Sequence, residues 1–152
     1  MLKFREIGTY KNAVNVGYCA ATVEMHNGQV AIFDEAAKTA SHPTNGKEAR
    51  LAIVMNTIDK PETHSPNEYV IEKDEYPRLF VLESLKGRII DMDTDQVETA
   101  YADINVGDVL VGNANGKLEV SADGGTGYAV SFVVIEKTSF NGEGLAVKVV
   151  IA

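Results

Sequence analysis

The sequence predicts an all-β fold, an antiparallel β-barrel or sandwich with long loops. Three observations carry this prediction. Short apolar stretches with strand-like alternation recur from residue 13 to the end of the chain. Asn-Gly and Gly-rich turns separate the later stretches at intervals of roughly 8–12 residues, which is typical of sandwiches and barrels. The 152 residues, 45% of them hydrophobic, suffice for one buried core and are too few for a multidomain enzyme.

The first third of the chain has the least regular pattern. Residues 1–13 are predicted to form an N-terminal arm, and residues 14–152 a single β domain. Within that domain, the stretches from Val14 to Met25 and from Gln29 to Phe33 are predicted to form a hairpin. The reason is the dipeptide Asn27-Gly28 between them, which offers the two positive-φ positions of a tight turn.

Two further segments precede the middle of the chain. Residues 34–48 mix a short helix-capable piece with His42-Pro43 and Asn45-Gly46, so a long loop with at most one or two helical turns is expected. Arg50–Thr57 alternates apolar residues on both faces and is predicted to be a largely buried strand.

The middle of the chain contains the candidate boundary between two small lobes. Residues 58–68 hold two prolines and several charged residues, which block regular structure, so any seam between lobes is expected here. Tyr69–Ile71 is expected to be extended. A strand is predicted over Tyr76–Leu82, beginning at a sheet edge because Pro77 lacks a backbone donor. A further strand is predicted over Arg88–Asp93.

The final 50 residues have the clearest rhythm. Four strands are predicted there, separated by turns at Asn113–Gly116, Asp123–Gly127 and Asn141–Gly144: Asp108–Val111, Lys117–Val120, Tyr128–Thr138 and Leu145–Ile151. In the last strand, Val147, Val149 and Ile151 share one face. Lys148 lies on the opposite face, which is therefore expected to be wet.

The charge balance excludes several kinds of partner. The net charge is −8, the wrong sign for a chain that must neutralise phosphates, so neither nucleic acid nor an anionic membrane is expected to bind. The charge is also uneven. Residues 1–13 carry a net charge of +2, whereas residues 56–103 hold 12 acidic residues against five basic ones. No stretch has the length and hydrophobicity of a signal peptide or a transmembrane helix.

The sharpest chemical candidate is the run Asp91-Met92-Asp93-Thr94-Asp95, because carboxylates at every second residue begin many calcium loops. An EF-hand loop starting at Asp91 requires glycine and glutamate where this chain has Gln96 and Ala102, so that motif fails. In a strand, the three aspartates are expected to project from one solvated face, with Met92 on the other. A calcium- or carbohydrate-binding β module remains an alternative function based on this run.

No catalytic constellation and no cofactor site is predicted. His26, His42 and His64 are isolated in the sequence, without a second ligand at metal-binding spacing. Cys19, the only cysteine, lies in an apolar run and is expected to be a buried, inert thiol. The Gly-rich segment Asp123–Gly127 lacks the Lys and Ser or Thr of a phosphate-binding loop, so it is interpreted as a turn.

Several stretches resemble known viral proteins. Tyr69–Leu82 resembles a pattern in small structural proteins of tailed bacteriophages, in which an extended segment and an acidic turn precede an aromatic and apolar strand. Four later stretches are similar to the β-barrel region of phage head decoration (cement) proteins: Ile104–Leu110, Asn115–Leu118, Gly127–Val130 and Leu145–Val149.

This resemblance implies a protein with no enzymatic activity and no cofactor. It implies that the chain binds the major capsid protein on the outer surface of the virion head as a homotrimer and stabilises neighbouring capsid subunits, after synthesis in the cytoplasm of the host bacterium. Another phage structural role, in a head fibre base, tail or baseplate, is the first alternative. As capsid contacts we predict five residues of the N-terminal arm: Lys3, Phe4, Arg5, Tyr10 and Lys11. The arm is expected to bind the shell by adding a strand to an exposed sheet edge. Its removal is expected to leave the β domain folded.

Overall fold

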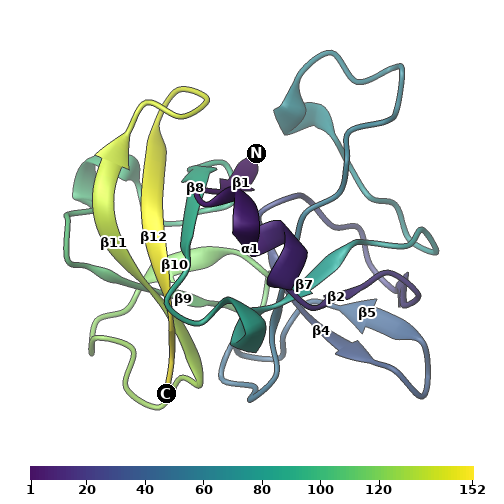
Figure 1. Cartoon of the computed structure of the whole chain (residues 1–152), viewed down its shortest axis with the longest axis horizontal. Helices are drawn as coiled ribbons and strands as arrows, with labels where there is room; N and C mark the ends of the chain where they lie inside the picture. The colour runs from purple at the N-terminus through teal and green to yellow at the C-terminus, as the bar shows by residue number, and fades with distance from the viewer.

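Two six-stranded sheets, A and B, pack face to face in the computed structural model, which describes all 152 residues (Figure 1). The sequence left a barrel and a sandwich open, and the structure shows a sandwich-like arrangement without a closed barrel. In spatial order, sheet A consists of β1 (Leu2–Phe4), β8 (Ile89–Asp93), β12 (Gly144–Ile151), β11 (Val130–Thr138), β9 (Val109–Gly112) and β10 (Leu118–Val120). Sheet B consists of β2 (Asn15–Val16), β7 (Leu79–Val81), β6 (Ala52–Val54), β4 (Val30–Asp34), β5 (Thr39–Ser41) and β3 (Ala20–Ala21).

Helical structure is confined to short segments. These are the α-helix α1 (Ile7–Asn12) and the 3-10 turns η1 (Pro66–Glu68), η2 (Leu82–Leu85) and η3 (Tyr101–Asp103). None of them has the length and hydrophobicity needed to cross a membrane.

The main hydrophobic core lies between the two sheets. Sheet A contributes side chains such as Phe132, Leu145 and Val147, and sheet B contributes Ile53 and Phe80. Since one cluster of 20 buried residues draws on both sheets, they share a core.

Sheet B buries its second face as well. Ala52, Val54, Leu79 and Val81 point away from sheet A into a cluster of 12 buried residues, and the chain before β4 covers that cluster with Cys19 and other apolar residues. Burial on both faces explains the nearly continuous apolar runs at β6 and β7. The predicted buried strand over Arg50–Thr57 is confirmed as β6.

The four strands predicted in the final 50 residues are confirmed as β9, β10, β11 and β12, and the predicted strand before them as β8. The predicted hairpin around Asn27-Gly28 is wrong, because β4 pairs with β5 and β6 and not with the preceding residues. Gly28 has the expected positive φ of 97°, but Asn27 bonds to the backbone of Asn56 at the end of β6. A tertiary contact therefore replaces the local hairpin pairing.

Residues 34–48 contain a strand that the sequence did not indicate. β5 forms there because its three residues pair with both β4 and β3, and Ala40 is buried. The strand predicted near Pro77 is shorter than expected and is not at an edge. β7 begins at Leu79 and lies between β2 and β6.

The chain crosses between the sheets at places other than residues 58–68. That segment connects β6 and β7, which are neighbours within sheet B. The crossings lie instead at α1, between β1 and β2, and at η2, between β7 and β8. Sheet B is thus an insertion between the first and second strands of sheet A.

The first 13 residues do not form a separate arm. β1 pairs antiparallel with β8, with Lys3 opposite Asp91, and Leu2 and Phe4 are buried in the shared core. Hydrophobic burial of these two side chains, together with backbone pairing, explains why the segment joins sheet A.

Candidate functional site

The aspartate run lies at the end of β8, next to β1 and to the turn between β11 and β12. Met92 points into the shared core, and Asp91 and Asp93 lie on the opposite face of the strand, as predicted. That face is not solvated at these positions, because Asp91 and Asp93 are only 6% and 4% exposed. The expectation of a solvated aspartate face is therefore wrong for these two residues, and only Asp95, beyond the strand, is exposed.

Asp91 is engaged by Arg5. The guanidinium donates from Nη2 to Oδ1 at 2.6 Å and from Nε to Oδ2 at 3.2 Å, a bidentate pair. Arg5 also reaches Glu136, with an Nη2–Oε2 distance of 3.3 Å. The hydrogen bond with Asp91 is the main reason that the pKa of Arg5 is raised. Arg5 therefore stays charged and covers the carboxylate that the sequence offered as a metal ligand.

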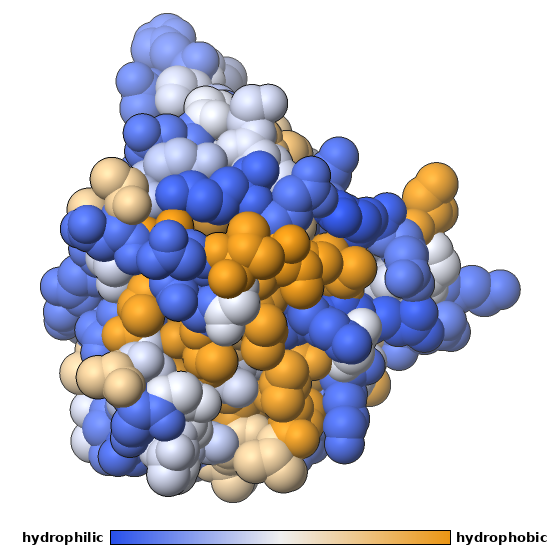
Figure 2. Space-filling model, turned by 90° about the vertical axis from the view of Figure 1, so that its left-hand side faces the viewer, coloured by the Kyte–Doolittle hydropathy of each residue, from blue (hydrophilic) through white to orange (hydrophobic).

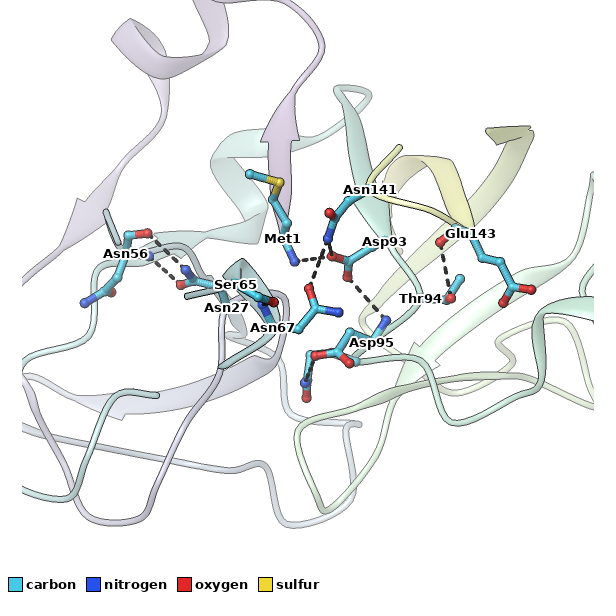
Figure 3. Close-up of polar contacts among 11 residues, drawn as sticks. Met1, Asn27, Asn56, Ser65, Asn67, Asp93, Thr94, Asp95, Asn141 and Glu143 are labelled. Carbon is cyan, nitrogen blue, oxygen red and sulfur yellow. Dashed lines mark hydrogen bonds and ion pairs between the residues drawn. The ribbon is translucent and has the colours of Figure 1, made fainter. Parts of the chain in front are cut away.

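Asp93 accepts three hydrogen bonds (Figure 3). The donors are the amino group of Met1 at 2.6 Å, Nδ2 of Asn141 at 2.8 Å and the backbone N–H of Asp95 at 3.2 Å. A buried carboxylate needs such partners. Asp93 thereby ties the turn after β8 to the turn between β11 and β12.

A polar hollow of about 380 Å³ opens beside Asp93. Asn141 connects its two sides by donating from Nδ2 to Oδ1 of Asn67 at 3.0 Å as well as to Asp93 (Figure 3). The hollow is lined by Asn67, Asp93, Thr94, Asp95, Asn141 and Glu143. The sequence did not point to this pair, because 74 residues separate Asn67 from Asn141, and Asn141 was expected only to form a turn.

The arrangement of these groups suits structural hydrogen bonding better than metal binding. Asp91 is held by Arg5, and Asp93 is surrounded by donors, which would repel a cation. No group of three or more His, Cys, Asp or Glu side chains is placed to hold a metal ion. The structure thus brings Asp93 and Asp95 to one hollow and leaves Asp91 outside it.

Comparisons with known proteins identify no relative. No family model, curated protein or solved structure matches this chain.

The five residues predicted to contact a capsid lie in different environments. Lys3 is exposed on the outer face of sheet A, 5.3 Å from the ring centroid of Phe140. Phe4 is 3% exposed and belongs to the core, so it is not a surface contact. Tyr10 packs on Phe4 at a centroid distance of 4.6 Å, and its hydroxyl accepts a hydrogen bond from the Phe4 N–H at 3.1 Å. Arg5 covers Asp91, and Lys11 is exposed near the end of α1.

Two of the three histidines approach each other in space. The amide oxygen of Gln29 accepts from the backbone N–H of His26 at 2.9 Å and lies 3.2 Å from Nε2 of His42. Burial lowers the pKa of His42, and proximity to His26 adds to that effect. His64 is exposed on the loop before η1. Cys19 is fully buried, and desolvation raises the pKa of its thiol, so it is not an activated nucleophile.

The largest unexpected feature is the outer face of sheet A. Because Phe132, Val147 and Val149 point into the core, their neighbours in sequence point outward. The outward side chains on four adjacent strands include Ile89, Val109, Val133 and Val150, with Lys148 opposite both Val133 and Ile89. Figure 2 shows a broad apolar area on the side of the molecule where β11 lies, bordered by hydrophilic residues. From the sequence, the face that carries Lys148 is expected to be wet, whereas most of its other side chains on these strands are apolar.

Proposed function

We propose that this chain is a bacteriophage head decoration protein that binds the major capsid protein through the outer face of sheet A. The observation that carries the proposal is the apolar outer face itself. β11 and β12 have apolar residues on both faces, which is typical of strands that are covered on both sides. An exposed apolar area with a polar border marks a protein contact site.

The cations at this face favour an acidic partner. Lys3 and Lys148 project from it and form no ion pair within the chain, while Arg5 lies beside Lys3. Unpaired positive charges on a protein of net charge −8 are complementary to a negatively charged surface on another protein. In this proposal, Lys3 and Arg5 keep the role in capsid contact that the sequence indicated, whereas Phe4 acts in folding.

The sequence resemblance supports the same role. It implies a non-enzymatic virion component on the outside of the head, present as homotrimers. The aspartate cluster is consistent with a structural function, because its buried carboxylates hold the fold together through hydrogen bonds to Arg5 and Asn141. Many identical copies on a closed shell require a small, self-sufficient fold with one defined contact surface. The shared core and the broad apolar area on the side of β11 meet that requirement.

A binding assay with matched variants tests the contact surface. Val133→Lys places a charge in the centre of the outer face, whereas Val23→Lys makes the same change at an exposed valine on the sheet B side. Purified capsids are incubated with each protein and sedimented. We expect Val133→Lys to weaken binding at least about tenfold and Val23→Lys to bind as the unmodified protein does. Equal binding by both variants, with unchanged circular dichroism, would exclude this face.

The number of copies separates decoration from other phage roles. Mass spectrometry of purified particles from the source of this sequence should detect the chain in amounts comparable with the major capsid protein. A few copies per particle would indicate a fibre, tail or baseplate component instead. Absence from particles would contradict the proposal altogether.

A further inference from the structure

Tyr76 stands between two hollows on the surface of sheet B. The residue is 62% exposed, among the most exposed of the large hydrophobic residues. One hollow, of about 330 Å³, lies on the side of Asn15 and Arg78; the other, of about 390 Å³, lies on the side of Lys60 and Glu75. Asn56, Asp59 and Tyr76 line both of them. The two hollows therefore flank one exposed aromatic ring.

The surroundings hold these groups in place before any ligand binds. Tyr76 and Arg78 are exposed on either side of Pro77, which is buried and has a fixed φ. The backbone N–H of Arg78 donates to Oδ1 of Asn56, and the backbone carbonyl of Arg78 accepts from Met55 at 3.0 Å. Such fixed geometry lowers the entropic cost of binding.

Asn56 is itself held by Asn27. The side-chain amide of Asn27 donates to the carbonyl oxygen of Asn56 at 3.0 Å and accepts from its N–H at 2.6 Å (Figure 3). This double hydrogen bond joins the turn before β4 to the end of β6. It explains why Asn27, in a turn at the surface of sheet B, is only 8% exposed.

Several polar side chains at the hollows have no partner within the protein. The guanidinium of Arg78, the carboxylate of Asp59 and the amide of Asn15 are exposed, and none of them makes a side-chain hydrogen bond or ion pair. Lys60, in contrast, is bound to Glu75 at 2.8 Å. A planar amide, a carboxylate and a guanidinium thus converge beside Tyr76 with their hydrogen-bonding capacity free.

We propose that Tyr76 and its two hollows bind a neutral oligosaccharide. The tyrosine ring provides a flat apolar surface for the C–H face of a sugar, and Asn15, Asp59 and Arg78 bond to its hydroxyl groups. The first hollow has a single apolar lining residue, whereas the centre of a protein interface is enriched in apolar and aromatic groups. Positive and negative side chains both line the hollows, which favours an uncharged ligand.

This site and the outer face of sheet A are on different sides of the molecule. The chain between β6 and β7, which includes Tyr76, lies on the side away from β11 (Figure 1). A molecule attached to a capsid by sheet A therefore keeps Tyr76 exposed to the surroundings. The oligosaccharide site does not depend on the decoration role, and either one can fail without the other.

Binding is measured by saturation-transfer difference NMR and titration calorimetry with four probes at millimolar concentration: chitohexaose, cellohexaose, mannohexaose and maltohexaose. We expect at least one probe to bind the full chain. Tyr76→Ala should weaken that binding at least about tenfold, and Arg78→Ala should weaken it in the same direction. Tyr76→Phe, which keeps the ring, should retain binding.

Val106→Ala serves as the control, because Val106 is also 62% exposed but does not line either hollow. It should bind the probes as the unmodified chain does. Failure of all four probes to bind overturns the proposal, and so does equal binding by Tyr76→Ala. If Tyr76→Ala loses capsid binding and no probe binds, the surface is a protein contact and the oligosaccharide assignment is wrong.

Discussion

Gly46 illustrates how closely single residues join the two sheets. It lies in the loop between β5 and β6, with a φ of +76°. A Cβ atom at this position would stand 1.8 Å from the carbonyl oxygen of Gly112 in β9. The loop from sheet B therefore touches the backbone of sheet A, and only glycine permits that approach.

We expect Gly46→Ala to be among the most destabilising single substitutions in the chain. Gly107 is the matched control, because it has a φ of +97° and a Cβ atom there would have no other atom within 4 Å. Gly107→Ala should lower the free energy of unfolding by about 1–2 kcal/mol, the cost of the left-handed conformation. Gly46→Ala should lower it by roughly 4 kcal/mol or more, because the backbone must also move. Urea unfolding measures both, and equal losses would contradict the close contact.

His42 should make stability depend on pH below neutrality. Burial lowers its pKa in the folded chain from the ordinary value of 6.5. Between that lowered pKa and 6.5, the unfolded chain binds the proton more readily, so the free energy of unfolding falls as pH decreases through this range. Above 6.5, both states are neutral and the effect vanishes.

The midpoint of thermal unfolding at pH 7.5 and at pH 5.5 measures this effect. His42→Gln, which can still donate to Gln29, should reduce the drop in the midpoint between the two pH values. His64→Gln removes an exposed histidine and should leave the drop unchanged. The assignment to His42 is wrong if the two variants behave alike.

At the scale of elements, the three-residue strand β1 contributes to the packing of sheet A against sheet B. Phe4 contacts Tyr10 of α1 and also lies 5.1 Å, between ring centroids, from Phe80 of β7. Through this ring, together with Leu2 in the shared core, the edge strand of sheet A is packed against sheet B. Deleting residues 1–11 would remove a strand and part of the core, so the loss of capsid binding in such a variant would not identify a contact surface.

Phe4→Ala should therefore destabilise the fold by about 3–5 kcal/mol, as expected for a large buried aromatic residue. Lys3→Ala, in the adjacent position but on the outer face, should change the free energy of unfolding by less than about 0.5 kcal/mol. Chemical denaturation followed by far-UV circular dichroism compares them. Similar small effects from both substitutions would mean that the N-terminal segment is a free arm after all.

At the scale of the whole molecule, the two sheets should unfold together. Sheet B is inserted between β1 and β8, and the same core contains Ile53 from sheet B and Val147 from sheet A. Neither sheet can keep its inner face covered when the other unfolds. Cooperative unfolding is the expected consequence.

Native-state hydrogen exchange tests this cooperativity. The backbone amides of Ile53 and Val147 should exchange with the same free energy of opening, equal to that of global unfolding. The exchange of both amides is measured in the unmodified protein at neutral pH. Clearly lower protection for Ile53 than for Val147 would show that the sheets behave as two separate lobes.

Local pattern determined much of sheet A. Strands β9 to β12 were predictable because each is a short, largely apolar run bounded by turn-forming residues, as Val130–Thr138 is. Turns such as Asn113–Gly116 depend on their own residues. The burial of Cys19 followed from the same local reasoning. Hydrophobic alternation and turn chemistry are properties of adjacent residues, so the sequence alone carries them.

Only the tertiary structure decided the contacts between distant segments. β1 paired with β8, Asn27 bonded to Asn56 in place of forming a hairpin, and Asn67 met Asn141 beside Asp93. It also left β11 and β12 with an uncovered apolar face and placed Tyr76 beside two hollows. Such pairings depend on which surfaces remain to be buried once the local strands exist, and that is a property of the whole folded chain.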